Sequence, residues 1–181
     1  MRADAIRLRA AALAGWLVLA AATAPALAAG QPAGASWRVQ GEATLRFLGM
    51  AIYDATLSVP AGFDPDAWTA QPLALALRYH RGLSGKAIAE RSLQEMRRGG
   101  AIDEAQAARW LAFMKEALPD VRAGDRIVGR WTPASGTVSL QVNDAPAREM
   151  ADREFGTRFF GIWLAAHTSE PALRARLLGL S

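Results

Sequence analysis

Apolar and polar residues alternate along residues 45–59, LRFLGMAIYDATLSV, as they do in a β-strand with one buried face. Every second residue from Leu45 to Val59 is apolar, aromatic or small, and this face is predicted to pack in the core. The opposite face is polar at both ends and apolar in its middle, where it presents Leu48, Met50 and Ile52. We therefore expect another layer of structure to cover that middle.

Four further strands and four helices are predicted from the remaining pattern. Apolar runs bounded by turn residues predict strands at residues 37–41, 73–79, 125–132 and 137–142. Helical spacing and capping residues predict helices at residues 85–98, 103–118, 152–165 and 170–178, with Ser84, Asp103 and Asp152 as N-caps. Strands and helices come in groups and do not alternate one by one. This order favours an α+β fold, a large, mostly antiparallel sheet with a helical layer on one face.

The first 28 residues have the composition of a secretory signal peptide. Three arginines precede an apolar run at residues 10–22, and Ala26-Leu27-Ala28 supplies the small residues of a cleavage site. An uncleaved anchor is the alternative, but the apolar run is about 13 residues long and a spanning helix needs about 20. We therefore predict cleavage before Ala29, a periplasmic location, a flexible lead-in at residues 29–36 and one domain at residues 37–181.

The chain has no cysteine, so no disulfide can form after export and stability must come from packing. Without residues 1–28 the chain keeps 18 basic and 16 acidic residues, a net charge of +2. The high isoelectric point of the whole chain is therefore partly due to the predicted signal peptide. The sequence shows no basic run and no aromatic-basic interleaving. We expect neither a nucleic-acid partner nor a stable membrane span after cleavage.

The sequence contains little recognisable chemistry. His80 and His167 are its only histidines and lack neighbouring ligands, so no metal site is predicted. It has no phosphate-binding or dinucleotide motif and no cysteine nucleophile, and no cofactor is expected. The conspicuous residues are polar side chains in apolar segments. Arg46 either lies in solvent or points into a cavity as a partner for a carboxylate. Glu95 either lies on a solvated helix face or pairs with Arg91 or Arg98.

Four stretches carry a resemblance to a known family. They are GEATLRFLGMAIYDATL, LRYHRGLSGKAIAERSLQEM, LPDVRAGDRIVGRWTPASGTVSLQVND and REFGTRFFGIWLAAHTSEPALRARLLG, and they span residues 41–179. In their order and spacing the chain resembles a secreted bacterial member of the chalcone isomerase-like family, whose fold also serves plant fatty-acid-binding proteins. The resemblance implies an open-faced β-sandwich, in which a ligand cleft lies between a large antiparallel sheet and a helical layer. Leu48, Met50 and Ile52 are then expected on the floor of that cleft.

The same resemblance implies that the catalytic set of true chalcone isomerases is absent. The family positions for an arginine, a threonine, a tyrosine and an asparagine fall at Ala35, Leu48, Ile88 and Glu95, and only Thr157 keeps a hydroxyl at a cleft-lining position. Ring closure needs developing negative charge to be stabilised, and the loss of such a donor costs on the order of 2 to 4 kcal/mol. We therefore expect no chalcone isomerase activity.

Three functions are compatible with these residues. The leading hypothesis is a periplasmic, non-catalytic protein that binds a fatty acid or another amphipathic apolar ligand, with Arg46 and Tyr53 nearest the carboxylate. The second is an isomerase or lyase that uses Glu95 as a base, which requires Glu95 to face the cleft without a neutralising arginine. The third is an envelope interaction protein that uses exposed tryptophans such as Trp68 against a protein partner not yet known. The predicted binding residues are Arg46, Leu48, Met50, Tyr53, Ile88, Ser92, Glu95 and Thr157.

Overall fold

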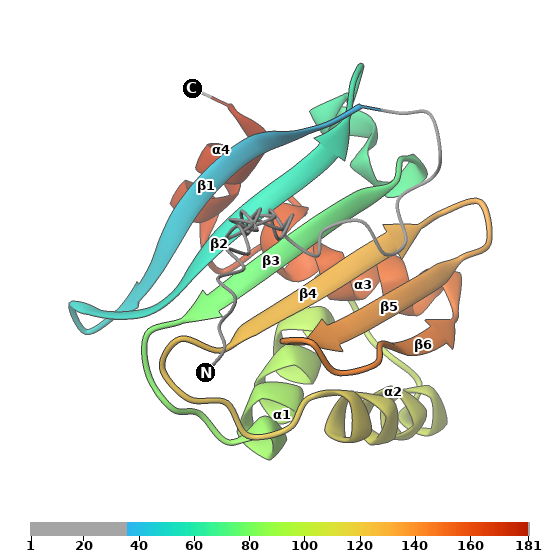
Figure 1. Cartoon of the computed structure of the whole chain (residues 1–181). Coiled ribbons are helices and arrows are strands. Elements are labelled where there is room, and N and C mark those ends of the chain that lie inside the picture. The colour runs from blue at the N-terminus through green and yellow to red at the C-terminus, as the bar shows by residue number, and fades with distance from the viewer. Residues whose placement is uncertain (1–35, 181) are drawn as a thin grey trace, which may run out of the picture. The chain divides into compact units, whose positions relative to one another are not determined.

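The strands form one antiparallel sheet. The computed structural model describes residues 36–180, so the predicted signal peptide and most of the lead-in lie outside the described residues. The strands are β1 (Trp37–Phe47), β2 (Met50–Pro60), β3 (Leu73–Tyr79), β4 (Arg126–Thr132), β5 (Thr137–Val142) and β6 (Arg148–Ala151). They lie side by side in chain order, each antiparallel to the next (Figure 1).

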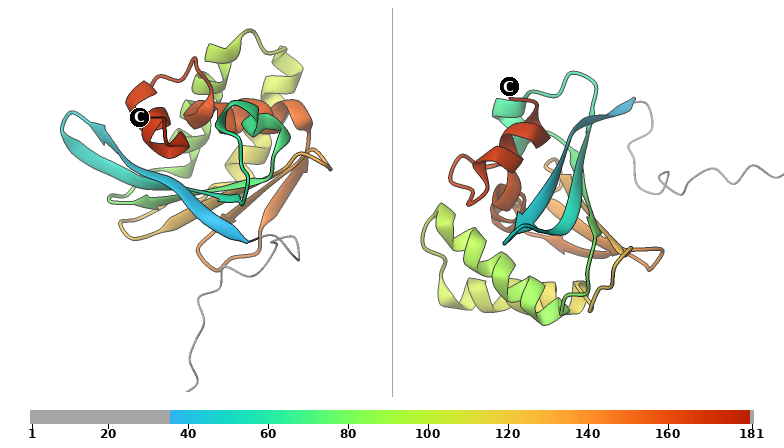
Figure 2. Two further views of the ribbon diagram at one scale, coloured as in Figure 1. Left: turned by 90° about the horizontal axis from the view of Figure 1, so that it is seen from above. Right: turned by 90° about the vertical axis from the view of Figure 1, so that its left-hand side faces the viewer.

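Helices cover one face of this sheet. They are α1 (Gly85–Met96), α2 (Glu104–Ala117), α3 (Arg153–Leu164) and α4 (Pro171–Leu178), with short 3-10 helices η1 (Pro65–Ala70) and η2 (Arg97–Gly99). All four α-helices lie on the same side of the sheet, and the described residues place no helix on the other side (Figure 2). The predicted α+β class and its open-faced arrangement are therefore confirmed. Within residues 36–180, no helix is long and apolar enough to cross a bilayer.

The predicted helix starts are confirmed by their capping hydrogen bonds. Ser84, Asp103 and Asp152 each accept a hydrogen bond from a backbone N–H in the first turn of α1, α2 and α3. Asp152 also accepts one from the Trp110 indole at 2.9 Å, which joins α2 to the start of α3. Helix α1 ends at Met96, two residues before the predicted end, and the chain continues as the 3-10 turn η2.

The prediction of one strand over residues 45–59 is wrong. Leu48 and Gly49 have φ angles of 48° and 80° and form the two-residue turn between β1 and β2. Positive φ at both positions is typical of a type I′ turn, whose twist fits that of the paired strands. A leucine in this left-handed conformation costs roughly 1 to 2 kcal/mol. The cleft floor assigned to Leu48 and Met50 does not exist, because these residues lie at an exposed turn.

Two β-bulges bend the first hairpin. The register between β1 and β2 shifts twice, which leaves Gln40 of β1 and Ile52 of β2 without an opposite residue. The Gln40 amide donates a hydrogen bond to the Leu178 carbonyl of α4 at 2.8 Å. The bulge at Ile52 allows two consecutive side chains, Ile52 and Tyr53, to line the same inner cavity.

Alternate residues of the strands point toward the helices and form the core. Leu57 on β2, Leu75 on β3 and Leu140 on β5 are each at most 2% exposed. On the helical side, aromatic rings contact one another from α2 along α3: Trp110, Phe155, Phe159, Phe160 and Trp163. Burial of apolar surface contributes about 25 cal/mol per Å². The interface between sheet and helices is therefore the main source of stability in this cysteine-free chain.

Candidate functional site

A cavity of about 330 Å³ lies between the inner face of the sheet and helices α1 and α3. Most of its wall is apolar, contributed by strands and helices alike: Leu45, Leu77, Leu83, Ile88, Leu118, Ile127, Phe159 and Ile162. Its volume is near the lower end of the range of about 300 to 1,000 Å³ for small-molecule sites. The cavity therefore suits one short alkyl chain or a small ring system.

A hydrogen bond joins the sheet to the helical layer at the cavity wall. The Trp163 indole of α3 donates to the Tyr53 hydroxyl of β2 at 2.9 Å, and the rings of Tyr53 and Tyr79 meet edge to face at 5.7 Å. Burial raises the pKa of Tyr53 to about 12, the Trp163 hydrogen bond opposes this rise, and the carboxylates of Glu170 and Glu95 add to it. Tyr53 is therefore a neutral hydroxyl at physiological pH, able to donate its own proton to a ligand oxygen.

Helix α1 supplies the charged groups of the cavity. Arg91 and Glu95 lie one turn apart, and Arg91 Nη2 is 2.5 Å from Glu95 Oε1. The second carboxylate oxygen, Glu95 Oε2, is 3.6 Å from Arg98 Nε. The Glu95 side chain is only 9% exposed, and its Oε2 accepts no hydrogen bond from the part of the chain that the structure describes. The Arg91 side chain is 68% exposed, so this ion pair lies where the cavity meets solvent.

Ser92 adds a short side chain rather than a free hydroxyl. It lines the cavity between Arg91 and Glu95, and its Oγ donates to the Ile88 carbonyl one turn earlier at 2.8 Å. The loop before α4 contributes Glu170 to the same region. One end of an otherwise apolar cavity is therefore polar, which makes the site amphipathic.

Four of the eight predicted binding residues line this cavity. They are Tyr53, Ile88, Ser92 and Glu95. Their positions agree with the sequence prediction of an apolar cleft with a few polar groups. Whether they bind a ligand stays a prediction.

The other four lie elsewhere, because of the hairpin turn and the orientation of α3. Leu48 and Met50 are 83% and 49% exposed at the turn, and Arg46 beside them donates to the Gly49 carbonyl at 3.2 Å. Thr157 donates to the Arg153 carbonyl of its own helix and lines a separate surface hollow. The prediction that these four residues line the cleft is therefore wrong.

The sequence analysis missed most of the cavity wall, including three residues that bear on its chemistry, and it missed the role of a fourth. Tyr79, Trp163 and Glu170 were not proposed, and Arg91 was considered only as a partner of Glu95. Tyr79 was predictable, because it shares a strand face with Leu73, Leu75 and Leu77, all of which are buried. The partnership of Trp163 with Tyr53 spans 110 residues and leaves no local pattern.

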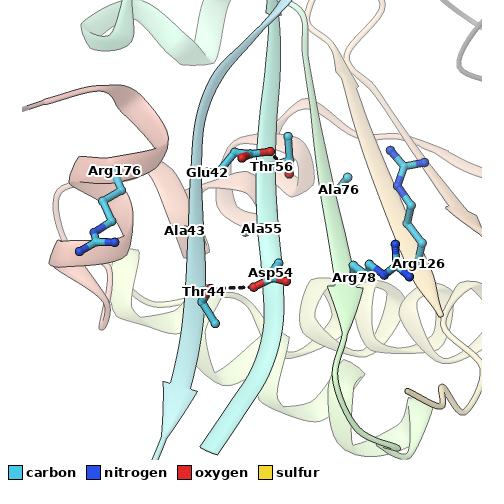
Figure 3. A pocket seen from close by; sticks show the side chains of 10 residues that line it. All are labelled: Glu42, Ala43, Thr44, Asp54, Ala55, Thr56, Ala76, Arg78, Arg126 and Arg176. Carbon is cyan, nitrogen blue, oxygen red and sulfur yellow. Dashed lines mark hydrogen bonds between the residues drawn. The ribbon is translucent and has the colours of Figure 1, made fainter. Parts of the chain in front are cut away.

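A second, open hollow of about 480 Å³ lies where the outer face of the sheet is exposed. Figure 3 shows Glu42, Thr44, Asp54 and Thr56 on β1 and β2, with arginines on β3 and β4. Asp54 accepts from Thr44 at 2.6 Å and is 2.8 Å from His80 Nε2. The Thr44 hydrogen bond is the main reason that the pKa of Asp54 lies below its usual value, and the His80 hydrogen bond adds to it. Thr56 donates to Glu42 at 3.1 Å, so the polar side chains of β1 and β2 in this hollow are paired with one another.

Metal chemistry finds no support in the geometry. Residues 36–180 contain no group of three or more histidine, cysteine or carboxylate side chains close enough to hold a metal ion. The expectations of no metal and no cofactor stay predictions.

A family model described as chalcone isomerase-like matches residues 28–179. The chain belongs to this family. A Haemophilus influenzae (strain Rd) protein, described as uncharacterized, is 28% identical over 109 residues, a match that covers 60% of this chain and 52% of that protein. The chain thus matches about half the length of this curated relative.

The fold is also shared with a solved structure from a plant. The crystal structure of a fatty-acid binding protein of Arabidopsis thaliana aligns with a TM-score of 0.59 at 12% identity, covering 80% of this chain and 88% of that chain. At this identity the likeness shows the fold alone. Together with the family match, it confirms the family resemblance predicted from the four sequence stretches.

The positions transferred from the family's catalytic motifs fall in different parts of the structure. Ile88 and Glu95 line the cavity, whereas Leu48 lies in the hairpin turn and Thr157 on the far side of α3. Ala35 lies outside the described residues. The positions transferred to α1 thus lie at the cavity, whereas the position transferred to Leu48 falls in a turn that the sequence analysis did not recognise.

The tyrosines provide a direct test of the cavity. The chain contains only Tyr53 and Tyr79, both line the cavity, and burial raises the pKa of each. We predict no tyrosinate absorbance near pH 10 in the folded protein, and its appearance only near pH 12 or on unfolding. Because the folded state holds these protons more tightly, their contribution to stability is full below about pH 10 and is lost as the pH rises above that value. Ultraviolet titration measures this, and ionisation near pH 10 without unfolding would contradict it.

Proposed function

We propose that this protein binds a fatty acid or another small amphipathic ligand in the cavity between the sheet and helices α1 and α3, without catalysing its conversion. The single observation that supports the proposal is an apolar cavity of about 330 Å³ with its polar groups gathered at one end. Each methylene moved from water into such a wall contributes about 0.8 kcal/mol. An alkyl chain therefore supplies affinity, and the polar end orients the head group.

The polar end can receive a head group in two ways. The Tyr53 hydroxyl donates to a ligand oxygen, and Arg91 offers N–H groups to a carboxylate. Glu95 competes with an acidic head group, because it already holds Arg91 at 2.5 Å. A neutral hydroxyl head group instead donates to Glu95 Oε2, the buried oxygen that accepts no hydrogen bond from the described residues.

The alternative functions receive less support. An isomerase or lyase with Glu95 as its base requires a carboxylate without a neutralising arginine, but Glu95 is 2.5 Å from Arg91 and 3.6 Å from Arg98. An interaction protein that uses Trp68 requires that side chain to be accessible, but Trp68 is only 7% exposed. Neither geometric condition is met.

The periplasmic location is part of the same proposal and rests on the sequence of residues 1–28 alone, which lie outside the described residues. Expression of the full chain in a Gram-negative host, followed by osmotic shock, should release a protein whose first residue is Ala29. A product that keeps residue 1 and stays with the membrane fraction would contradict export by a cleaved signal peptide. Mass spectrometry of an organic extract of the released protein would identify a co-purified ligand.

Filling the cavity should abolish binding. In Ser92→Phe the new ring occupies the cavity, because Ser92 is buried and lines it. Gln94→Phe is the matched control, since Gln94 is an exposed residue of the same helix. We predict that decanoic acid displaces a fluorescent fatty-acid analogue from the wild type and from Gln94→Phe. Ser92→Phe should bind the analogue at least about ten-fold more weakly, because the new ring displaces a few methylene groups of the ligand from the apolar cavity.

Two controls make this outcome decisive. Thermal unfolding shows whether Ser92→Phe is folded, and Ile88→Trp provides a second cavity-filling variant at a half-buried position. Equal binding by the wild type and by both folded, cavity-filled variants would place the ligand elsewhere. Absence of any binding by the wild type would overturn the proposal itself.

The contacts of the ligand head group are tested by changing the charged residues Arg91 and Glu95 of α1. Glu95→Gln frees Arg91 for a ligand carboxylate, and Arg91→Gln removes that cation. Because Arg91 is largely exposed, we predict changes of only about two- to five-fold: tighter binding of decanoic acid by Glu95→Gln and weaker binding by Arg91→Gln. Decanol should respond differently, with weaker binding by Glu95→Gln, which loses a strong acceptor. Identical responses of acid and alcohol would show that the head group does not contact Arg91 or Glu95.

A further inference from the structure

The turn between β1 and β2 exposes an unusual group of apolar side chains. Phe47, Leu48 and Met50 are 63%, 83% and 49% exposed. Two other large apolar residues are exposed among residues 36–180, Val39 at 55% and Leu180 at 39%, and both lie outside this turn. We call Phe47, Leu48 and Met50 the hairpin tip. The turn extends beyond the ends of the neighbouring strands (Figures 1 and 2).

Folding does not account for the leucine at the tip. Leu48 has a φ of 48°, a position of the turn that asparagine, aspartate and glycine occupy with less strain. Its side chain is almost fully in solvent, so the folded state gains little packing from it. A strained and exposed apolar residue points to a partner outside the folded chain.

Two arginines flank the tip. Arg46 donates to the Gly49 carbonyl at 3.2 Å, and Arg81 Nη1 is 3.7 Å from the Met50 sulfur. Neither forms an ion pair within residues 36–180. The nearby carboxylate of Asp54 is already hydrogen-bonded to Thr44 and His80. The tip thus combines apolar side chains with positive charge, the combination that binds the surface of an anionic bilayer.

The shape of the tip favours a lipid surface over a protein. A stable protein interface buries about 800 Å² on each partner. Three side chains, of which phenylalanine is the largest at roughly 200 Å², cannot supply that area. A bilayer needs only a few apolar side chains that reach past its head groups.

The hairpin tip is also adjacent along the chain to residues that line the cavity. Leu45 comes immediately before Arg46, Ile52 follows Met50 by two residues, and both Leu45 and Ile52 line the cavity. We propose that the hairpin tip docks the protein onto an anionic lipid bilayer, with Phe47, Leu48 and Met50 inserted and with Arg46 and Arg81 at the head groups. Docking places the cavity wall beside the bilayer, from which an apolar ligand can enter.

The experiment is vesicle sedimentation with the exported protein, expressed as the full chain. Vesicles of phosphatidylcholine containing phosphatidylglycerol are compared with vesicles of phosphatidylcholine alone. We expect binding to the anionic vesicles that weakens with salt. Leu48→Asn should bind about ten-fold more weakly, since it loses the insertion of one leucine side chain. Asparagine suits the turn, so this variant should be at least as stable as the wild type.

Further variants separate the electrostatic part of docking from the insertion of apolar side chains. Arg46→Gln combined with Arg81→Gln should reduce binding to anionic vesicles by about ten-fold or more and remove the preference for them. Val39→Asn is the matched control, because Val39 is 55% exposed on the same strand but away from the turn, opposite Ser58. Its vesicle binding should equal that of the wild type.

Three outcomes would overturn docking: no binding to anionic vesicles, unchanged binding by Leu48→Asn, or an equal loss in Val39→Asn. Sedimentation velocity without vesicles tests whether the tip instead binds a second copy. Self-association of the wild type that Leu48→Asn abolishes, without vesicle binding, would also overturn the proposal. Displacement of the fatty-acid analogue by decanoic acid in solution should be unchanged in Leu48→Asn, so failure of docking and failure of ligand binding are distinguishable.

Discussion

An antiparallel sheet with one apolar face is stable only when that face is buried, and the other features of this protein depend on how four helices bury it. Aromatic side chains of α3 contact one another along this interface. Helix α1 lines the cavity beside Tyr53 with Ala87, Ile88, Arg91, Ser92 and Glu95. Two of these five side chains, Ala87 and Ser92, are small, which leaves room between this helix and the sheet.

The polar groups of the cavity differ in how many of their hydrogen bonds are formed within the protein. The Tyr53 hydroxyl has a donor in Trp163 and keeps its own proton, whereas Glu95 is bound to Arg91 through one oxygen and has a second, buried oxygen near Arg98. A buried acceptor without a hydrogen bond is unfavourable in a closed core and useful in a binding site. The exposed apolar turn of the first hairpin adjoins this cavity along the chain, because Leu45 and Ile52 on either side of the turn line its wall.

Local signals in the sequence predicted most of the elements. Caps at Ser84, Asp103 and Asp152 located three helices, because a capping side chain bonds the backbone next to it. The turn at Leu48 and Gly49 escaped prediction, since leucine is rare in that conformation and the residues on either side of the turn, Phe47 and Met50, are apolar. Strand β6, four residues long and mostly exposed at an edge, was also missed, because its backbone pairing with β5 has no counterpart in the side-chain pattern.

The sequence by itself determined the fold class, the helix starts and the family resemblance, since each depends on residues close together or on the order of whole segments. It also placed Ser92 and Glu95 close together on one helix, because residues three apart in a helix are neighbours. Only the tertiary structure decided which residues meet across the interface. Tyr53 and Trp163 lie 110 residues apart, and one two-residue turn moved Arg46, Leu48 and Met50 from the predicted cleft to the surface. Side-chain direction alternates only within a strand, so the missed turn misplaced the residues at and beside it, whereas Leu57 and Val59 farther along β2 are buried as predicted.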